Sequence, residues 1–143
     1  MEWNQLKFYH RNPPSVTLGR TPDVLCSYDI YTEYLKSINR SVTQDVICKY
    51  LNHDQPFSIA LNQFPYDLAT NIHHFVVWIN PNYSDIITED YIESYLHNYL
   101  INDYVLFENL NNVKSIKQIR HYQLFLSNPI FIAVLQSLSS FIP

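Results

Sequence analysis

Glycine is nearly absent from this chain, which has a single one, Gly19, among 143 residues. Phosphate-binding loops of the dinucleotide and mononucleotide types require several glycines at fixed spacing, so both loop types are excluded. The cysteines, Cys26 and Cys48, match no structural zinc spacing with the histidines. Neither cysteine has a basic setting or begins a helix, so neither is a candidate nucleophile. We therefore expect no metal site and no bound cofactor.

Basic residues and long apolar runs are also scarce. Nine Lys and Arg stand against 13 Asp and Glu, giving a net charge of −4, whereas a broad nucleic-acid-binding surface requires a basic face. The longest apolar run, residues 130–135, is far shorter than the roughly 20 residues of a membrane span. The polar start, Met1–Phe8, predicts no secretory leader. We therefore expect a cytoplasmic protein, with both cysteines as reduced, partly buried thiols.

Bulky apolar side chains are abundant, with 12 Tyr and 8 Phe in a chain that is 47% hydrophobic. This composition predicts one folded domain over residues 1–143 and excludes a disordered chain. We divide the domain into an extended N-terminal arm (1–22), a core (23–128) and an apolar C-terminal tail (129–143). The arm is expected to be extended because its prolines interrupt a helix.

The spacing of apolar residues changes between helical and strand-like along the core. Helices are predicted over 23–38, 43–51 (with Thr43 as N-cap) and 88–101, and strands over 57–61, 73–80, 104–107 and 119–126. This order predicts an α+β fold with a mainly antiparallel sheet of about four strands flanked by helices. The tail is expected to add a helix whose apolar stripe comprises Ile130, Val134, Leu138 and Phe141.

The last predicted strand carries two polar residues in an apolar setting. Side chains alternate along a strand, so His121 and Gln123 project from the same face. An imidazole can act as base, acid or nucleophile near neutral pH, and a carboxamide beside it can hold a phosphate or carbonyl oxygen. The pattern indicates a candidate catalytic histidine with a ligand-binding glutamine. Two ordinary hydrogen-bonding residues on a half-exposed face would give the same pattern.

A second candidate lies at the start of the predicted central strand. His73 and His74 are adjacent, so their side chains point to opposite faces and at most one of them can join His121. Trp78 shares the face of His74, where it would either fill the core or stack against a ligand.

A small basic cluster, Lys114, Lys117 and Arg120, comes just before His121. Such a cluster can bind the phosphate of a ligand, which makes Lys114 and Arg120 candidate ligand contacts. A solvated loop face would have the same composition.

The segment Asn62–Asp67 (NQFPYD) is followed by Ile72–Trp78 (IHHFVVW). The pair resembles the turn and strand of a fungal family of unknown function that includes N-acetylglucosamine-induced protein 1. The later segment Ile119–Leu124 looks like the family's second block, and the resemblance covers residues 18–126. It implies one shared fold and a site near these blocks, with Tyr66 of the turn as a further ligand contact. It implies no reaction.

Three positions depart from the family pattern, since Phe64 replaces a Trp, Asp67 a Gly and Gln123 a second His. If that second His is catalytic in the family, activity is in doubt here. A more distant likeness, to histidine-triad and nucleotidyltransferase proteins, implies His121 as nucleophile, because their nucleophilic His precedes a Gln by two residues. The abundance of Asn, Ile and Tyr suits an AT-rich genome such as that of a large DNA virus, which would place the protein in the host cytoplasm.

Two functions fit these patterns. The first is a small-molecule or nucleotide-phosphate site with His121 as nucleophile or base, His73 or His74 assisting, and Gln123 orienting the ligand. The second is a non-catalytic interaction or self-assembly protein, in which the tail (129–143) forms a homodimer or binds a protein partner.

Overall fold

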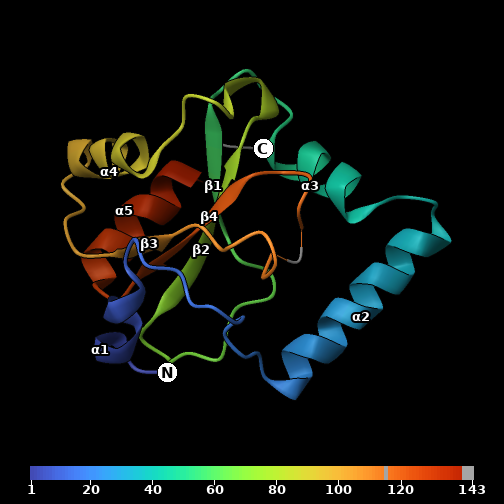
Figure 1. Cartoon of the computed structure of the whole chain (residues 1–143), viewed down its shortest axis with the longest axis horizontal. Coiled ribbons are helices and arrows are strands. Elements are labelled where there is room, and N and C mark those ends of the chain that lie inside the picture. The colour runs from blue at the N-terminus through green and yellow to red at the C-terminus, as the bar shows by residue number, and fades with distance from the viewer. Residues whose placement is uncertain (115, 140–143) are drawn as a thin grey trace.

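A four-stranded antiparallel sheet forms the centre of the molecule, in a computed structural model that describes residues 1–114 and 116–139 (Figure 1). The strands are β1 (Phe57–Leu61), β2 (His73–Ile79), β3 (Val105–Phe107) and β4 (His121–Leu126), in the spatial order β1-β2-β4-β3. All neighbouring pairs are antiparallel, which confirms the predicted α+β fold. β2 and β4 are the central strands, since each is paired on both edges.

Helices cover both faces of this sheet. They are α1 (Trp3–Leu6), α2 (Pro22–Ser37), α3 (Val42–Tyr50), α4 (Glu89–Asn98) and α5 (Pro129–Ser139), with short 3-10 turns at Lys7–Tyr9 and Pro81–Tyr83. Figure 1 shows α4 and α5 on one side of the sheet and α3 on the other, with α2 projecting outward beyond α3. Within the described ranges, no helix combines the length and the apolar character that crossing a membrane requires.

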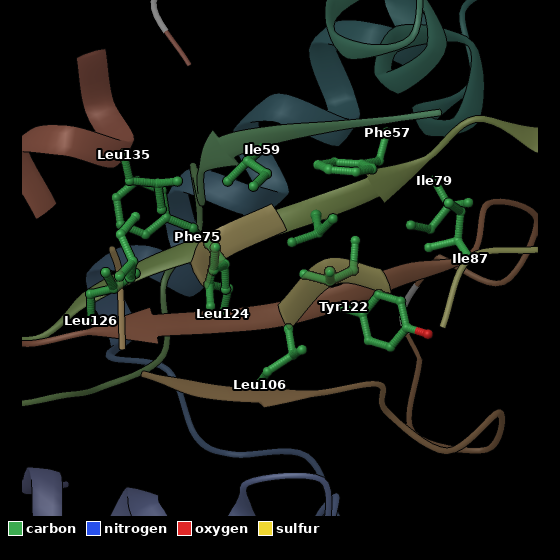
Figure 2. Packing of buried hydrophobic residues seen from close by; sticks show 14 of the residues in the cluster. Phe57, Ile59, Phe75, Ile79, Ile87, Leu106, Tyr122, Leu124, Leu126 and Leu135 are labelled. Carbon is green, nitrogen blue, oxygen red and sulfur yellow. The ribbon is translucent and has the colours of Figure 1, made fainter. Parts of the chain in front are cut away.

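The sheet face under α4 and α5 carries the main core. Alternation along β2 and β4 sends one set of apolar side chains to this face, namely Phe75, Val77, Ile79, Tyr122, Leu124 and Leu126. Ile92 and Leu96 of α4 and Leu135 of α5 pack against them, and Figure 2 shows Leu135 reaching down to the sheet. Because burial of each such side chain contributes about 1.5–3 kcal/mol, this layer holds the central strands in one fixed plane.

The opposite face of the sheet is covered at its two ends. At one end Leu6 of the N-terminal arm packs with Tyr66 and Phe125. At the other end Val46 of α3 packs with Trp78. Positions of β2 and β4 on this face, Val76 and Trp78 with His121 and Gln123, form the floor of a pocket.

The N-terminal arm differs from the prediction. Trp3–Leu6 form a helical turn, so the extended arm predicted over 1–22 was wrong in its first part. Glu2 and Gln5 start the turn through a reciprocal capping box, a local signal upstream of the prolines. The turn places Leu6 at 0% exposure against the sheet, which explains why this segment folds back onto the core.

Two smaller predictions were also wrong. Ser41 rather than Thr43 caps α3, because its hydroxyl accepts from the Gln44 N–H at 3.0 Å while the Gln44 side chain accepts from the Ser41 N–H at 2.8 Å. Cys26 and Cys48 are exposed rather than partly buried, since α2 and α3 turn those positions away from the sheet.

The tail is helical and packs on its own sheet. Ile132 and Leu135 of α5 join the main core, whereas Ile130 is 70% exposed. The predicted stripe was therefore wrong at Ile130, whereas Val134 is partly buried and packs against the core, because the buried side of the helix centres on Ile132 and Leu135. Phe141, the last residue of that stripe, lies outside the described residues.

The scarcity of glycine leaves left-handed backbone positions to other residues. Leu100 (φ 62) and Asn39 (φ 57) each follow the C-cap of a helix. After α4, the Leu100 N–H donates to the His97 carbonyl at 2.9 Å and the Ile101 N–H to the Leu96 carbonyl at 3.0 Å. This is the Schellman arrangement, whose left-handed position glycine usually fills because it has no Cβ.

Replacing Leu100 by glycine is expected to stabilise the protein. Leu100→Gly should raise the free energy of unfolding by about 1 kcal/mol, because glycine adopts positive φ without a steric penalty. The leucine side chain is 79% exposed, so little packing is lost. Urea denaturation measures the change, with Tyr99→Gly as the matched control that should destabilise, since Tyr99 has φ −99. A lower stability for Leu100→Gly would contradict strain at this position.

Candidate functional site

A pocket of about 210 Å³ lies between the middle of the sheet and helices α2 and α3. Alternate residues of the central strands form its floor, because Val76 pairs with Gln123 and Trp78 pairs with His121. Its walls come from α2, α3 and the segment 61–64 at the end of β1. The predicted His and Gln therefore lie together on the floor of one pocket.

His121 presents one nitrogen atom to this pocket. Its Nδ1 lies 2.8 Å from the Ile119 carbonyl oxygen, and a carbonyl only accepts, so Nδ1 carries the proton and Nε2 the lone pair. Among residues 1–114 and 116–139, Nε2 has no hydrogen-bond partner. Burial lowers the pKa of the His121 imidazole, so the ring is uncharged at neutral pH and keeps this lone pair.

His74 has both ring nitrogens engaged. The Tyr66 N–H donates to its Nδ1 at 3.2 Å, so Nε2 carries the proton and donates to Oε1 of Gln123 at 2.6 Å. Burial lowers the pKa of His74 to about 3, although the Gln123 hydrogen bond acts in the opposite direction. His74 is thus a neutral residue that fixes the carboxamide oxygen of Gln123, a residue of the pocket lining.

Aromatic rings form two of the pocket's surfaces. Tyr50 of α3 stacks on Trp78 with ring centroids 5.8 Å apart and planes 9° apart. Tyr28 and Tyr31 of α2 pack against Phe64 with centroid distances of 5.1 and 5.2 Å. Such surfaces favour a ligand with a flat ring, because ring faces and edges attract one another at these distances.

Asp45 joins the two helices of the pocket wall. Its carboxylate accepts a short hydrogen bond from the Tyr31 hydroxyl of α2 and pairs with Lys49 of α3 at 2.9 Å. The Arg40 side chain lies 3.7 Å away. Burial opposes ionisation of Asp45, but these partners outweigh it and lower the pKa of its carboxyl group. Asp45 is therefore an ionised anchor whose charge is already balanced.

Arg20, in the loop before α2, is the remaining charged residue of the lining. Its Nε donates to the Phe64 carbonyl at 2.8 Å, and its guanidinium carbon lies 4.8 Å from the Tyr66 ring centroid. These contacts fix the side chain, yet no carboxylate in the described part of the chain forms an ion pair with it. The positive charge of Arg20 is therefore available to an anionic ligand in the pocket.

The pocket brings together several of the residues predicted from the sequence. His121, Gln123 and Trp78 line it, and His74 is hydrogen-bonded to Gln123 on the same face of the sheet. His73 projects from the other face of β2, so only one of the adjacent histidines reaches the site. No group of three or more His, Cys, Asp or Glu side chains in the described ranges could hold a metal ion.

Other predicted contacts lie outside the lining. Lys114 and Arg120 both form ion pairs with Glu108, at 2.9 and 3.1 Å. Their positive charges, which were predicted to bind a ligand, are therefore neutralised within the protein. Tyr66 is 5% exposed and lies against the His74 ring with centroids 4.5 Å apart. Tyr66 therefore packs beside the pocket floor and holds His74 in place.

Sequence reasoning missed Arg20, Tyr31 and Asp45. The only available signal was local, since Tyr28 and Tyr31, and likewise Asp45 and Lys49, have the spacing of one helical face. Nothing in that spacing shows that α2 and α3 face a strand that comes much later in the chain.

Comparisons with known proteins identify a family but no activity. A family described as "Protein of unknown function (DUF3605)" matches residues 2–127, so the chain belongs to this family of unknown function. The crystal structure of HTC1 is similar, with a TM-score of 0.65 and 17% identity over 97% of this chain and 95% of that chain. At this identity the likeness shows the fold alone. The comparison with curated proteins gives no match.

The buried His74 should make stability depend on pH. Unfolding restores the ordinary pKa of 6.5 in place of about 3, so the unfolded chain binds one more proton between these values. Stability should therefore fall as pH drops from 6.5 towards 3, by up to about 1.4 kcal/mol per pH unit from this group.

Urea denaturation across this pH range measures the slope in wild type and in His74→Gln, which should have a shallower one. His97→Gln, at an exposed position of α4, is the matched control. Equal slopes in wild type and His74→Gln would contradict a neutral, buried His74.

Proposed function

We propose that this member of the DUF3605 family binds a small molecule of the nucleotide-phosphate type in the pocket between the sheet and α2 and α3. One observation carries the proposal: the Nε2 lone pair of His121 and the carboxamide of Gln123 project into a pocket from the same face of β4. Ligand pockets are mostly apolar with a few placed polar groups, and this one has that composition.

The walls support a ligand with a flat ring. Trp78 and Tyr50 on one side, and Tyr28, Tyr31 and Phe64 on the other, offer ring faces and edges of the kind that hold heterocycles. The stacking role considered for Trp78 is part of this proposal.

The charge in the pocket supports an anionic ligand. Its charged lining residues are Arg20, Lys49 and Asp45, a formal sum of +1 from two cations and one anion, in a chain whose net charge is −4. Arg20 and Lys49 thus take the place that the sequence suggested for Lys114 and Arg120.

His121 is the residue that would carry any reaction in this pocket. Its lone pair is free and its lowered pKa keeps the ring neutral, so it can act as base or nucleophile. His74 cannot share that role because both of its nitrogens are engaged, and it assists only by holding Gln123.

The interaction protein remains the alternative proposal, with less support. Its predicted surface, the tail, directs Ile132 and Leu135 into the protein's own core and leaves Ile130 outside. The narrower resemblance to N-acetylglucosamine-induced protein 1, the viral source and the cytoplasmic location stay predictions.

A thermal-shift screen of nucleotides and sugar phosphates tests the proposal. A ligand present at about 100 times its Kd should stabilise the folded protein by about 2.7 kcal/mol, which is a shift of several degrees. His121→Ala should reduce the shift because the ligand loses a hydrogen-bond partner, whereas His97→Ala, outside the pocket, should not. The proposal fails if no ligand at millimolar concentration shifts the transition, or if both variants keep the wild-type response.

A further inference from the structure

We infer that one end of the pocket is a subsite for an oxoanion, a carboxylate or phosphate group, made by Arg20 and Gln123 and positioned by His74. The inference rests on the proposed function, because it specifies which chemical group of the ligand lies at which end. It concerns the end of the pocket nearest the 62–66 turn, whereas His121 and Trp78 line the other end.

The first argument is the fixed direction of the Gln123 carboxamide. A free carboxamide can turn either its oxygen or its nitrogen towards a ligand. Here the backbone N–H of Tyr66 occupies the His74 Nδ1, which forces the His74 proton onto Nε2 and the Gln123 oxygen towards that proton. The side-chain nitrogen of Asn62 lies 3.4 Å from Nδ1 and 3.2 Å from Nε2, and of these two atoms only Nδ1 can accept from it. Gln123 can therefore offer only N–H donors to the pocket.

The second argument is the unpaired charge of Arg20. Its Nε donates to the Phe64 carbonyl and its guanidinium carbon lies over the Tyr66 ring, so these two contacts hold the guanidinium group in place. The positive charge also acts on His74, where it contributes to the lowered pKa of the imidazole. The Tyr66 ring connects the two groups, since the Arg20 guanidinium carbon lies 4.8 Å and the His74 ring centroid 4.5 Å from the Tyr66 ring centroid. Arg20 and the His74–Gln123 pair therefore lie at the same end of the pocket.

The third argument is the absence of a competing acceptor. Asp45 is the one carboxylate of the described lining, and Tyr31, Lys49 and Arg40 already engage it. An amide donor and a guanidinium without a carboxylate partner form a site for a group that only accepts hydrogen bonds. Carboxylate and phosphate oxygens are such groups, and their bonds to Arg are charge-assisted.

The test uses three small aromatic probes of similar shape that differ in the polar group: benzoate, phenylphosphonate and benzamidine. Each is titrated into the full-length 15N-labelled protein while side-chain amide signals of Gln123 and Asn62 and the Trp78 indole signal are followed by NMR. We expect benzoate and phenylphosphonate to shift these signals and benzamidine to leave them unchanged. The tighter of the two anions distinguishes a carboxylate from a phosphate ligand.

Charge-matched variants identify the residues. Arg20→Gln should weaken anion binding about 10-fold or more, because a charge-assisted hydrogen bond is lost. Lys117→Gln removes the same charge from an exposed position outside the pocket and should leave binding unchanged. Gln123→Glu keeps the shape but replaces the donor with a charged acceptor, so it should abolish anion binding and admit benzamidine.

His74 is tested as a positioning residue by rescue. His74→Phe removes the donor that orients Gln123 and should weaken anion binding and broaden the Gln123 amide signals. His74→Gln supplies another donor and should restore both, an outcome that a purely space-filling role would not give.

Three results overturn the inference: benzamidine binding as well as benzoate, equal effects of Arg20→Gln and Lys117→Gln, or no response to any probe at high millimolar concentration. The nucleotide and sugar-phosphate screen tests the proposed function separately from each of these, since a nucleotide or sugar phosphate could still bind through His121 and Lys49 if Arg20 and Gln123 do not hold its anionic group.

Discussion

The hydrogen bond from His74 to Gln123 joins the two central strands on the face of the sheet that holds the pocket. It runs diagonally, because His74 lies opposite Phe125 and Gln123 lies opposite Val76 in the β2–β4 register. A buried polar pair is tolerated only when its donors and acceptors are satisfied. On the other side of the imidazole ring, the Tyr66 N–H donates to Nδ1 of His74, so both ring nitrogens have a partner. The direction of the His74–Gln123 hydrogen bond follows from that backbone contact.

The two faces of the same strands have different physical roles. Phe75, Val77 and Leu124 point towards α4 and α5 and set the plane of the sheet through apolar packing. Neighbouring positions of the same strands, among them His74 and Gln123, point to the opposite face and carry the polar groups of the pocket. A shift of one residue in the β2–β4 register would exchange the two sets and bury the polar groups in the main core. The apolar packing on one side therefore protects the geometry of the pocket on the other.

Much of the fold and part of the site could be predicted from the sequence, because both depend on the two-residue period of strands. Alternation alone placed His121 with Gln123 and separated His73 from His74. The contribution of Arg20 and Asp45 could not be predicted in this way, since it depends on how α2 and α3 pack against a strand distant in sequence. The basic cluster was misleading for the same reason. Glu108, six residues before Lys114, pairs with Lys114 and Arg120 of this cluster, and a charge count along the chain does not reveal that pairing.

Helix α2 is long but buries few of its side chains. It is 16 residues long and buries only Leu35, so it adds little to the global free energy of folding and belongs to the part of a structure that separates first. Besides Leu35, it is attached through the Tyr31–Asp45 hydrogen bond and the packing of Tyr28 and Tyr31 on Phe64, and these contacts lie in the pocket wall. A ligand in the pocket would also hold this helix down. Ligand binding and the packing of α2 against the sheet would then be thermodynamically coupled, so that each favours the other.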